Sequence, residues 1–318
     1  MVPVRLACAM LVGFAAWAVA AGAQGERLAR AEVSRATTHD ALEEVRASGE
    51  LRWGGDLQGG EPFVYEDPSD PRHIIGFEVE IADALARHLS VKRARFVQVD
   101  WSSLVTTLER GDVDIALNGL EDTAERRSRL RLSRPYFVFQ EVLAVRRGAT
   151  YRSFADLRGK RVATLNQSYA FAWLRDQPVD TVLYEGQQEP YFDLQQGRVD
   201  AVLLDDVIAR RYGCVLPEVV CLPEAIARGT YVIAARKDDE VVAHAIDDAL
   251  GHMIERGELQ SILERWKLWD GDQASLASGA LPPPPPAATP PRPGDQLRLF
   301  LEGAAVTVVL SVGAFAIA

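Results

Sequence analysis

The chain has 318 residues, of which 48% are hydrophobic and 25% are charged. This is a globular composition, and the length leaves room for two lobes of ordinary domain size. The formal net charge of -10 argues against nucleic acid as a partner, since a protein that binds a duplex needs a basic surface to displace counterions. The 3 cysteines and 5 scattered histidines show no metal-binding spacing, so we expect neither a metal ion nor a cofactor.

Residues 1–23 have the features of a signal peptide. Arg5 supplies an early charge, an apolar stretch follows, and the A-G-A tripeptide at residues 21–23 resembles a cleavage site. A membrane anchor is the alternative interpretation of the same stretch. Export would place the folded part, which follows an extension over residues 24–48, in an oxidising compartment.

Alternating strand and helix patterns follow. The first set predicts strands at 51–56, 94–100 and 112–119 and helices at 76–89 and 101–111. The second set predicts helices at 153–159, 168–176 and 189–197 and strands at 160–166, 181–186 and 198–206. This alternation is typical of an α/β fold in which helices cross over between parallel strands.

Two segments of the chain resemble each other. Residues 108–119 (LERGDVDIALNG) and 194–205 (LQQGRVDAVLLD) share a helix end, a glycine and an apolar strand, which indicates the same unit in each of two lobes. Chance is the alternative for so short a match. After the second unit we expect a strand at 229–239 and two helices over 240–269 that are interrupted near Gly257.

Polar residues follow three of the predicted strands. These residues are Asp56 after the first strand, Asn118, Gly119 and Glu121 after the third, and Asp205 and Asp206 after the equivalent strand of the second lobe. In open α/β sheets ligands bind beyond the carboxyl ends of the strands. Two lobes with facing polar edges therefore predict a cleft that closes on a small molecule.

Cys214 and Cys221 lie close together in the sequence CVLPEVVC. In an oxidising compartment they could bridge a short surface loop. Two free thiols are the alternative.

The C-terminal part begins with a proline-rich linker over residues 271–296, whose proline tract is expected to be stiff. Residues 297–318 are then mostly apolar, but their uncharged run is shorter than the ~20 residues that span a bilayer. We expect this segment to be the start of the first membrane helix of a longer protein. A C-terminal anchor that ends there is the alternative.

Seven stretches in a fixed order resemble the bacterial periplasmic solute-binding proteins of the amino-acid class, family 3. These are GELRWGGD…PF, GFEVEIADALA, VDWSSLVTTLERGDVDIALNG, TAERRSRLRLSRPYF, FADLRGKRVATLNQS, QQGRVDAVLLDD and GELQSILERWKLW. The apolar end resembles the first helix of the matching permease family. The resemblance implies a type II two-lobed fold, with lobe 1 at 49–138 and 231–270 and lobe 2 at 139–230. The lobes would be joined by strands that cross near 136–140 and 229–232.

The resemblance also implies roles for individual residues. Arg126 would bind the α-carboxylate of an amino acid, because arginine offers a planar fork that matches a carboxylate. Asp205 would bind the ammonium group, Asp56 would face the ligand's side chain, and Trp101 would pack on its aliphatic part. The remaining expected ligand-binding residues are Asn118, Gly119, Glu121 and Ser168.

Simpler roles compete with these. Asp205 could only cap a helix, Trp101 could only fill the core, and Asp56 could only shape a turn. Asp122 and Glu125 resemble a capping box, which would put Arg126 in the first turn of a helix. The other four arginines of this stretch, Arg127, Arg129, Arg131 and Arg134, are expected to serve the surface.

The chain departs from the family at two places. Glu121 stands where a threonine or serine is usual, and its charge would repel a ligand carboxylate unless it turned away or met an ammonium group. An aromatic residue that is often found near Gly60 is missing, and Tyr169 is expected to fill that space. The added negative charge favours a polar amino acid with a cationic or amide side chain.

We therefore expect a binding protein rather than an enzyme. It would reside in the periplasm, tethered to the inner membrane, and deliver its ligand to a fused permease that works with a cytoplasmic ATPase. Two alternatives are the sensing domain of a membrane receptor and an enzyme similar to cyclohexadienyl dehydratase, in which Glu121 or Asp205 would act as a general acid.

Overall fold

The computed structural model describes residues 41–279. The expected signal peptide (1–23), the extension up to residue 40, the linker beyond residue 279 and the apolar segment 297–318 lie outside the described residues. Within residues 41–279, no helix has both the length and the apolar character needed to cross a membrane.

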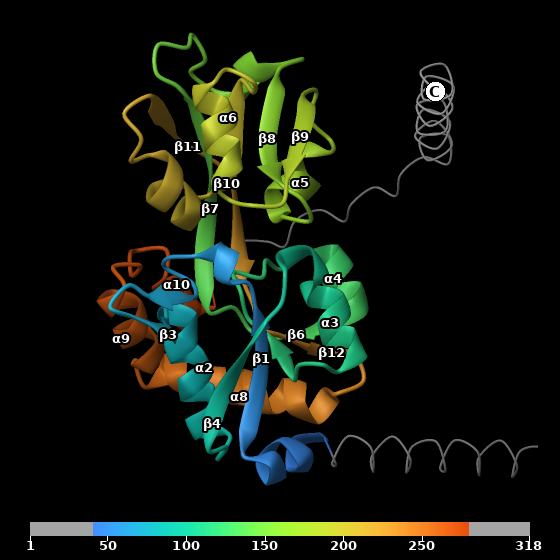
Figure 1. Cartoon of the computed structure of the whole chain (residues 1–318). Helices are drawn as coiled ribbons and strands as arrows, with labels where there is room; N and C mark the ends of the chain where they lie inside the picture. The colour runs from blue at the N-terminus through green and yellow to red at the C-terminus, as the bar shows by residue number, and fades with distance from the viewer. Residues whose placement is uncertain (1–40, 280–318) are drawn as a thin grey trace, which may run out of the picture. The chain divides into compact units, whose positions relative to one another are not determined.

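The first lobe is built on a five-stranded sheet in the order β4-β1-β5-β12-β6 (Figure 1). Its strands are β1 (Glu50–Gly55), β4 (Arg93–Gln98), β5 (Ile115–Ala116), β6 (Leu130–Leu132) and β12 (Ala234–Arg236). Strands β4, β1 and β5 are parallel, whereas β12 runs antiparallel to β5 and β6. Their parallel pairing brings the carboxyl ends of β1 and β5 to one edge, which is where the polar residues of the site begin.

Helices cover both faces of this sheet. They are α2 (Phe77–His88), α3 (Leu104–Arg110), α4 (Ala124–Arg129), α8 (Glu240–Glu255) and α9 (Glu258–Arg265). The apolar residues of α2, α8 and α9 belong to one buried cluster, and those of α3 belong to another. The helical spacing predicted for residues 76–89 is therefore the pattern of a helix that buries one side against the sheet.

The second lobe has a five-stranded sheet in the order β11-β7-β10-β8-β9. Its strands are β7 (Phe137–Arg146), β8 (Arg161–Leu165), β9 (Asp180–Tyr184), β10 (Ala201–Asp205) and β11 (Val219–Tyr231). Helices α5 (Tyr169–Leu174) and α6 (Glu189–Gln195) pack on this sheet through buried residues such as Leu174 and Leu194. The two sheets with their helices confirm the expected α/β fold of two lobes.

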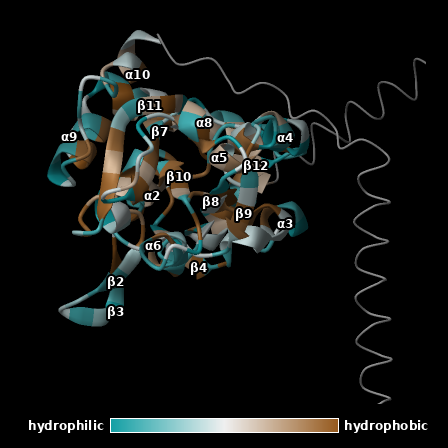
Figure 2. Cartoon of the chain, turned by 90° about the horizontal axis from the view of Figure 1, so that it is seen from above, coloured by the Kyte–Doolittle hydropathy of each residue, from teal (hydrophilic) through white to brown (hydrophobic). Residues whose placement is uncertain are grey.

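The remaining elements are short. They are η1 (Leu57–Gly59), β2 (Tyr65–Asp67), β3 (Asp70–Ile75), η2 (Trp101–Ser103), η3 (Phe154–Leu157), α7 (Asp206–Ile208), the π-turn η4 (Ala209–Gly213) and α10 (Ser275–Ser278). Strands β2 and β3 form a hairpin that projects from the body and is largely hydrophilic (Figure 2). Neither this hairpin nor β6 was predicted from the sequence.

Two antiparallel strands connect the lobes. Strand β7 enters the second sheet at Phe137 and β11 leaves it at Tyr231, and these two residues face each other in the ladder (Figure 1). Their rings stack at 5.4 Å, and the ring of Phe139 stacks on Tyr231 at 4.8 Å. A Cβ atom at Gly229 would lie 2.3 Å from the ring of Phe139, so this aromatic packing requires a glycine.

Three details of the predicted elements are wrong. The strand expected over 112–119 is reduced to Ile115–Ala116, and the strand expected over 229–239 is divided between the end of β11 and Ala234–Arg236. Helix α4 is capped by Thr123 rather than Asp122, with the Thr123 hydroxyl accepting a hydrogen bond from the Arg126 N–H. Arg126 nevertheless lies in the first turn, as expected.

Cys214 and Cys221 form a disulfide, with Cα atoms 5.5 Å apart. The bond joins the residue after η4 to strand β11. Both elements belong to the second lobe, so the disulfide does not restrict movement between the lobes.

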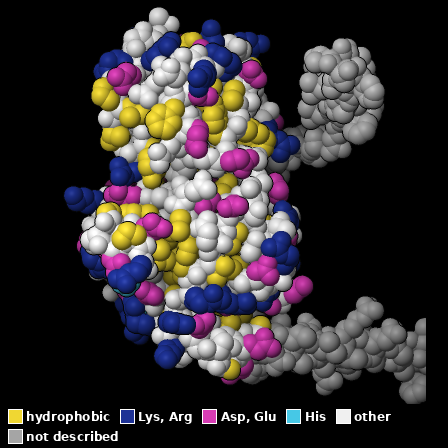
Figure 3. All heavy atoms as spheres, in the orientation of Figure 1, with side chains coloured by type: hydrophobic (Ala, Val, Ile, Leu, Met, Phe, Trp, Pro, Cys, Tyr) yellow, Lys and Arg dark blue, Asp and Glu magenta, His cyan; other side chains and the backbone are white. Residues whose placement is uncertain are grey.

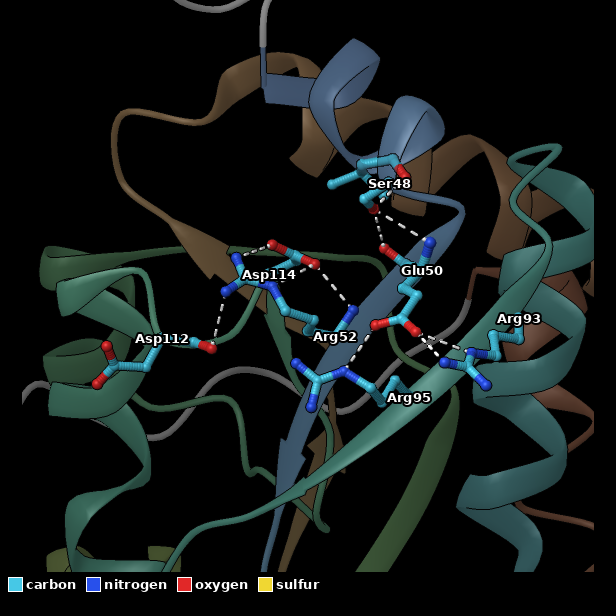
Figure 4. A network of polar contacts seen from close by, with 8 residues as sticks. Ser48, Glu50, Arg52, Arg93, Arg95, Asp112 and Asp114 are labelled. Carbon is cyan, nitrogen blue, oxygen red and sulfur yellow. Dashed lines mark hydrogen bonds and ion pairs between the residues drawn. The ribbon is translucent and has the colours of Figure 1, made fainter.

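Charged residues hold the amino-terminal end of the first sheet (Figure 4). The Arg52 guanidinium makes an ion pair with Asp114 at 2.6 Å, and Arg93 and Arg95 both pair with Glu50. This network lies at the start of β1, whereas Asp56 follows the end of the strand. It fixes the strand from the end away from the site.

Candidate functional site

A narrow cavity of about 40 Å³ lies between the two lobes. Its wall contains four carboxylates, contributed by Asp56, Glu121, Glu185 and Asp205. Three aromatic side chains, those of Phe63, Trp101 and Tyr231, also line it. The space admits on the order of three water molecules, so the two lobes lie close together in this structure.

Asp56 closes the lobe 1 side of the cavity. Its carboxylate accepts hydrogen bonds from the backbone N–H groups of Gln58 (2.9 Å) and Trp101 (2.9 Å) and from the side-chain amide of Gln98 (3.0 Å). It is also the N-cap of η1. Asp56 therefore shapes the turn and lines the cavity at the same time.

Arg126 and Glu121 form a buried ion pair beside the cavity. The Arg126 Nη1 lies 2.6 Å from Glu121 Oε2 and 2.8 Å from the Glu121 backbone oxygen. Both side chains are only 7% exposed. Glu121 thus neither turns away nor waits for a ligand ammonium group, because the chain's own arginine holds it.

The second lobe meets this pair with backbone groups. The Tyr169 N–H donates to Glu121 Oε1 at 3.1 Å, and the Gln167 carbonyl accepts from Arg126 Nη2 at 2.9 Å. Gln167 has a φ of 58°, a left-handed conformation that is uncommon for a residue with a side chain. The tight turn between β8 and α5 directs these backbone groups toward lobe 1.

Trp101 also joins the lobes. Its indole N–H donates to the Asn166 carbonyl at 2.9 Å, and its ring lies under the Arg126 guanidinium with 5.1 Å between the guanidinium carbon and the ring centroid. Trp101 is half-buried and lines the cavity. It is therefore more than a core residue, since it connects the arginine, the cavity and the second lobe.

Asn118 and Gly119 fix the end of β5. The Asn118 side-chain oxygen accepts from the Asp56 N–H, and the Gly119 N–H donates to Glu78 Oε1 at 2.6 Å. Burial raises the pKa of Glu78 to about 7. In this structure the Gly119 N–H is donated to Glu78. Gly119 has a φ of 57°, and a Cβ there would lie 2.8 Å from the Phe63 ring.

Asp205 provides negative charge from the second lobe. Its carboxylate accepts from the Ile208 N–H at 3.0 Å and caps α7. Burial, more than the neighbouring charges of Asp206 and Glu121, raises the pKa of Asp205 to about 7. Glu141, its partner across β7 and β10, is 1% exposed, and burial raises its pKa well above the usual range. A cation that entered here would stabilise the ionised form of Asp205.

The cavity brings together most of the predicted site residues. These are Asp56, Trp101, Asn118, Gly119, Glu121 and Asp205. Arg126 and Ser168 lie outside the cavity wall. The Ser168 hydroxyl caps α5 by accepting from the Phe171 N–H (3.0 Å) and donates to the Leu165 carbonyl (2.8 Å).

Tyr169 does not fill the space beside Gly60. Its hydroxyl donates to the Arg228 carbonyl at 2.9 Å, and its ring packs against Phe139. A Cβ on Gly60 would instead lie 2.2 Å from the Tyr212 hydroxyl. The aromatic ring next to this glycine therefore comes from η4 of the second lobe.

Sequence reasoning missed Gln187 and Glu185. Both follow the end of β9 and line the cavity. The Gln187 side-chain amide N–H donates to the Gly59 carbonyl at 2.8 Å, while its Oε1 is buried without a hydrogen-bond donor. The rule that found Asp56 and Asp205, polar residues beyond strand ends, would have identified both.

The other arginines of the stretch lie outward, with one qualification. Arg129, Arg131 and Arg134 pair with carboxylates that are at least partly exposed. Arg127 is 54% exposed but pairs with Asp122, which is only 7% exposed. Arg127 thus serves a buried carboxylate and not only the solvent.

Acidic side chains are visible at mid-height on the face of the molecule shown in Figure 3, where the two lobes meet. Among residues 41–279, no group of histidine, cysteine or acidic side chains is arranged to hold a metal ion. Carboxylates are the charged side chains of the cavity wall.

Known proteins share this architecture. The L-cystine-binding protein TcyJ of Escherichia coli strain K12 is 32% identical over 232 residues, which cover 71% of this chain and 85% of that protein. An ancestral arginine-binding protein bound to arginine superposes with a TM-score of 0.62 at 28% identity, covering 69% of this chain and 98% of that one. An ancestral amino acid-binding protein, described as a precursor of cyclohexadienyl dehydratase, superposes at 0.64 with 26% identity and coverage of 71% and 98%.

The sequence also matches a defined family over residues 51–268, which include both lobes and the cavity between them. The chain belongs to family 3 of the bacterial extracellular solute-binding proteins.

Proposed function

We propose that this protein captures a polar amino acid, with a cationic or amide side chain favoured, between its two lobes and delivers it to a membrane permease driven by a cytoplasmic ATPase. The observation that carries the proposal is the cavity wall, in which four carboxylates from the two lobes face one space. A cation that leaves water needs anionic partners, and such a wall supplies them.

The contacts between the lobes support a closing movement. Groups of lobe 1 bond to the Asn166 and Gln167 carbonyls and the Tyr169 N–H, and Gln187 reaches back to the Gly59 carbonyl. All of these bonds break if the lobes rotate apart about β7 and β11. A ligand that contacts both lobes would shift the population toward the closed form.

We further propose that the protein acts outside the cytoplasmic membrane and is tethered to it. The proposal is supported by the proline-rich stretch at 271–296 and the apolar residues that follow it. A tethered receptor meets its permease at an effective concentration that is commonly ~mM for short linkers. A binding rather than catalytic role is favoured because the curated relative named above is a binding protein.

Isothermal titration calorimetry against the 20 amino acids tests the function, and small-angle scattering tests the closure. We expect the cationic and amide amino acids to bind more tightly than aspartate and glutamate, and the best ligand to reduce the radius of gyration. Tightest binding by an acidic amino acid would contradict the proposed selectivity. Binding with an unchanged radius of gyration would contradict the closing movement.

A further inference from the structure

The buried ion pair between Glu121 and Arg126 bears on which cations the cavity accepts. Glu121 Oε2 lies 2.6 Å from Arg126 Nη1, and Glu121 Oε1 accepts from the Tyr169 N–H at 3.1 Å. A carboxylate of the chain itself thus accepts from one guanidinium nitrogen of Arg126 and from a backbone donor of the opposite lobe. The Gln167 carbonyl takes a further hydrogen of the same guanidinium at 2.9 Å.

A ligand carboxylate would find no cationic partner in the cavity. The described residues that form its wall include no lysine or arginine, and four of them are acidic. Arg126 is 6% exposed and lies outside that wall. An anionic group placed there would be desolvated, unpaired and surrounded by like charge, which is unfavourable at short range.

The wall suits N–H donors instead. Asp205 lies on one lobe and Asp56 on the other, so a ligand with positive charge at both ends can pair with both. Gln187 lines the cavity, and its buried Oε1 has no hydrogen-bond donor among the described residues. A ligand N–H group would satisfy it.

We propose that the preferred ligand is a small cation, an alkyl diamine or guanidino amine, that lacks a free carboxylate, and that Glu121 takes the place of the ligand carboxylate. This inference rests on the proposed cationic-ligand site, and it replaces the amino acid proposed above with an amine of the same side chain that lacks the carboxylate. Glu121 is the specificity-determining residue: paired with Arg126, it completes the closed form from within the chain. Ligand binding then needs only the positive groups and the alkyl part.

Matched ligand pairs that differ only in the carboxylate test the proposal. Agmatine is compared with arginine, and cadaverine with lysine, by calorimetry on the full chain at pH 7.5. We expect each amine to bind at least tenfold more tightly than its parent amino acid. In Glu121→Gln, which keeps the size of the side chain but frees the charge of Arg126, this preference should fall at least tenfold or reverse.

Glu125→Gln is the matched control, because Glu125 lies on the same segment and is 72% exposed. We expect it to keep the wild-type preference, and a melting curve of each variant verifies folding. Equal or tighter binding of arginine and lysine by the wild type would overturn this inference and leave the proposed amino-acid function standing. An unchanged preference in folded Glu121→Gln would overturn the role of Glu121. Absence of binding by all four cations would overturn the cationic site itself.

Discussion

The two lobes contribute different kinds of groups to their shared cavity. Lobe 1 supplies charged and aromatic side chains, chiefly those of Asp56, Trp101 and the Glu121–Arg126 pair. Lobe 2 forms hydrogen bonds with the Glu121–Arg126 pair and with Trp101 through backbone groups of a single turn at 166–169. Its side chains, Asp205 and Gln187, lie elsewhere in the wall.

This difference predicts that substitutions in the two lobes should affect stability and binding in different ways. A change in lobe 1 alters charge or a hydrogen-bond donor, so its effect should follow the chemistry of the side chain. The turn of lobe 2 presents the same backbone atoms whatever its side chains are, so its contribution depends on local geometry. The buried charge of lobe 1 is accordingly where the largest effects are expected.

Arg126→Ala tests the charge of lobe 1 and should have the largest effect. It leaves the buried Glu121 carboxylate without its ionic partner, which typically costs ~3–5 kcal/mol. We expect the free energy of unfolding to fall by that amount, because the buried carboxylate loses its partner. Urea unfolding measures this loss.

Arg129→Ala is the matched control for this change. Arg129 is 40% exposed and pairs with Glu109, which is 36% exposed. Such pairs contribute ~0–1 kcal/mol. If both alanine variants lose the same stability, the buried pair has no special role and the contrast between the lobes disappears.

The pH dependence of binding tests the charge that lobe 2 supplies. Because burial raises the pKa of Asp205 to about 7, this group is partly protonated below neutrality, and a cationic ligand must displace the proton. Affinity should therefore rise with pH from 5 to 7, by at most about tenfold per unit, and level off above. The stability of the protein without ligand should depend on pH in the opposite direction. Because the pKa of Asp205 is raised in the folded state, the free energy of unfolding falls as the pH rises from about 4 to 7.

Calorimetry at several pH values measures this dependence, and Asp205→Asn should flatten it. The ionisable groups that influence Asp205 are Asp206, Glu121 and the nearby Tyr231 and Glu141. If ligand affinity in Asp205→Asn still rose with pH as steeply as in the wild type, one of these neighbours and not Asp205 would be responsible.

Removing the disulfide separates the stability of lobe 2 from its role in binding. The Cys214–Cys221 bond closes a short loop, and the chain-entropy relation gives it ~2–3 kcal/mol. The double variant Cys214→Ser/Cys221→Ser should lose about that much stability in urea. Ligand affinity should stay within about twofold, because neither cysteine lines the cavity. A large loss of affinity in the folded variant would show that the geometry of the turn at 166–169 depends on the disulfide.

Trp101→Phe should have the smallest effect of the four. It removes one hydrogen bond between the lobes, to the Asn166 carbonyl, while keeping an aromatic ring. A net loss of ~0.5–1.5 kcal/mol is expected, which weakens ligand binding roughly two- to tenfold. Trp173→Phe is the control and should leave affinity unchanged, because Trp173 is a partly buried residue that packs against Phe154 in lobe 2 and does not line the cavity.

Much of the fold could be predicted because its helices and buried strands carry regular apolar patterns. The helices over 76–89 and 240–269 and the strand over 198–206 follow their spacing closely. The crossing strand β11 could not be recognised, since its 13 residues combine polar and apolar positions with a proline and two register shifts. Its conformation depends on pairing with β7, which is far away in the sequence.

The cavity wall was predictable where a residue lies at or just after a strand end, as Asp56, Asn118 and Asp205 do. The partner of Glu121 was not, because the contact with Arg126 depends on how the loop between β5 and α4 folds back. Backbone groups such as the Tyr169 N–H and the Gln167 carbonyl could not be predicted as part of the site, because almost every residue type carries the same groups. A positive φ at a glutamine gives no sequence signal either.

The order of strands in lobe 1 has a consequence for how the protein folds while it is being synthesised. Strand β12 lies between β5 and β6, yet it is reached in the chain only after the whole second sheet. The second sheet runs through one unbroken segment from Phe137 to Tyr231. As domains generally form as units during synthesis, the later segment can complete its sheet while the earlier lobe still lacks a central strand. Lobe 1 is thus synthesised first but completes its fold last. Until Ala234–Arg236 has been synthesised and pairs with β5, the edge of β5 remains unpaired and needs protection from other chains.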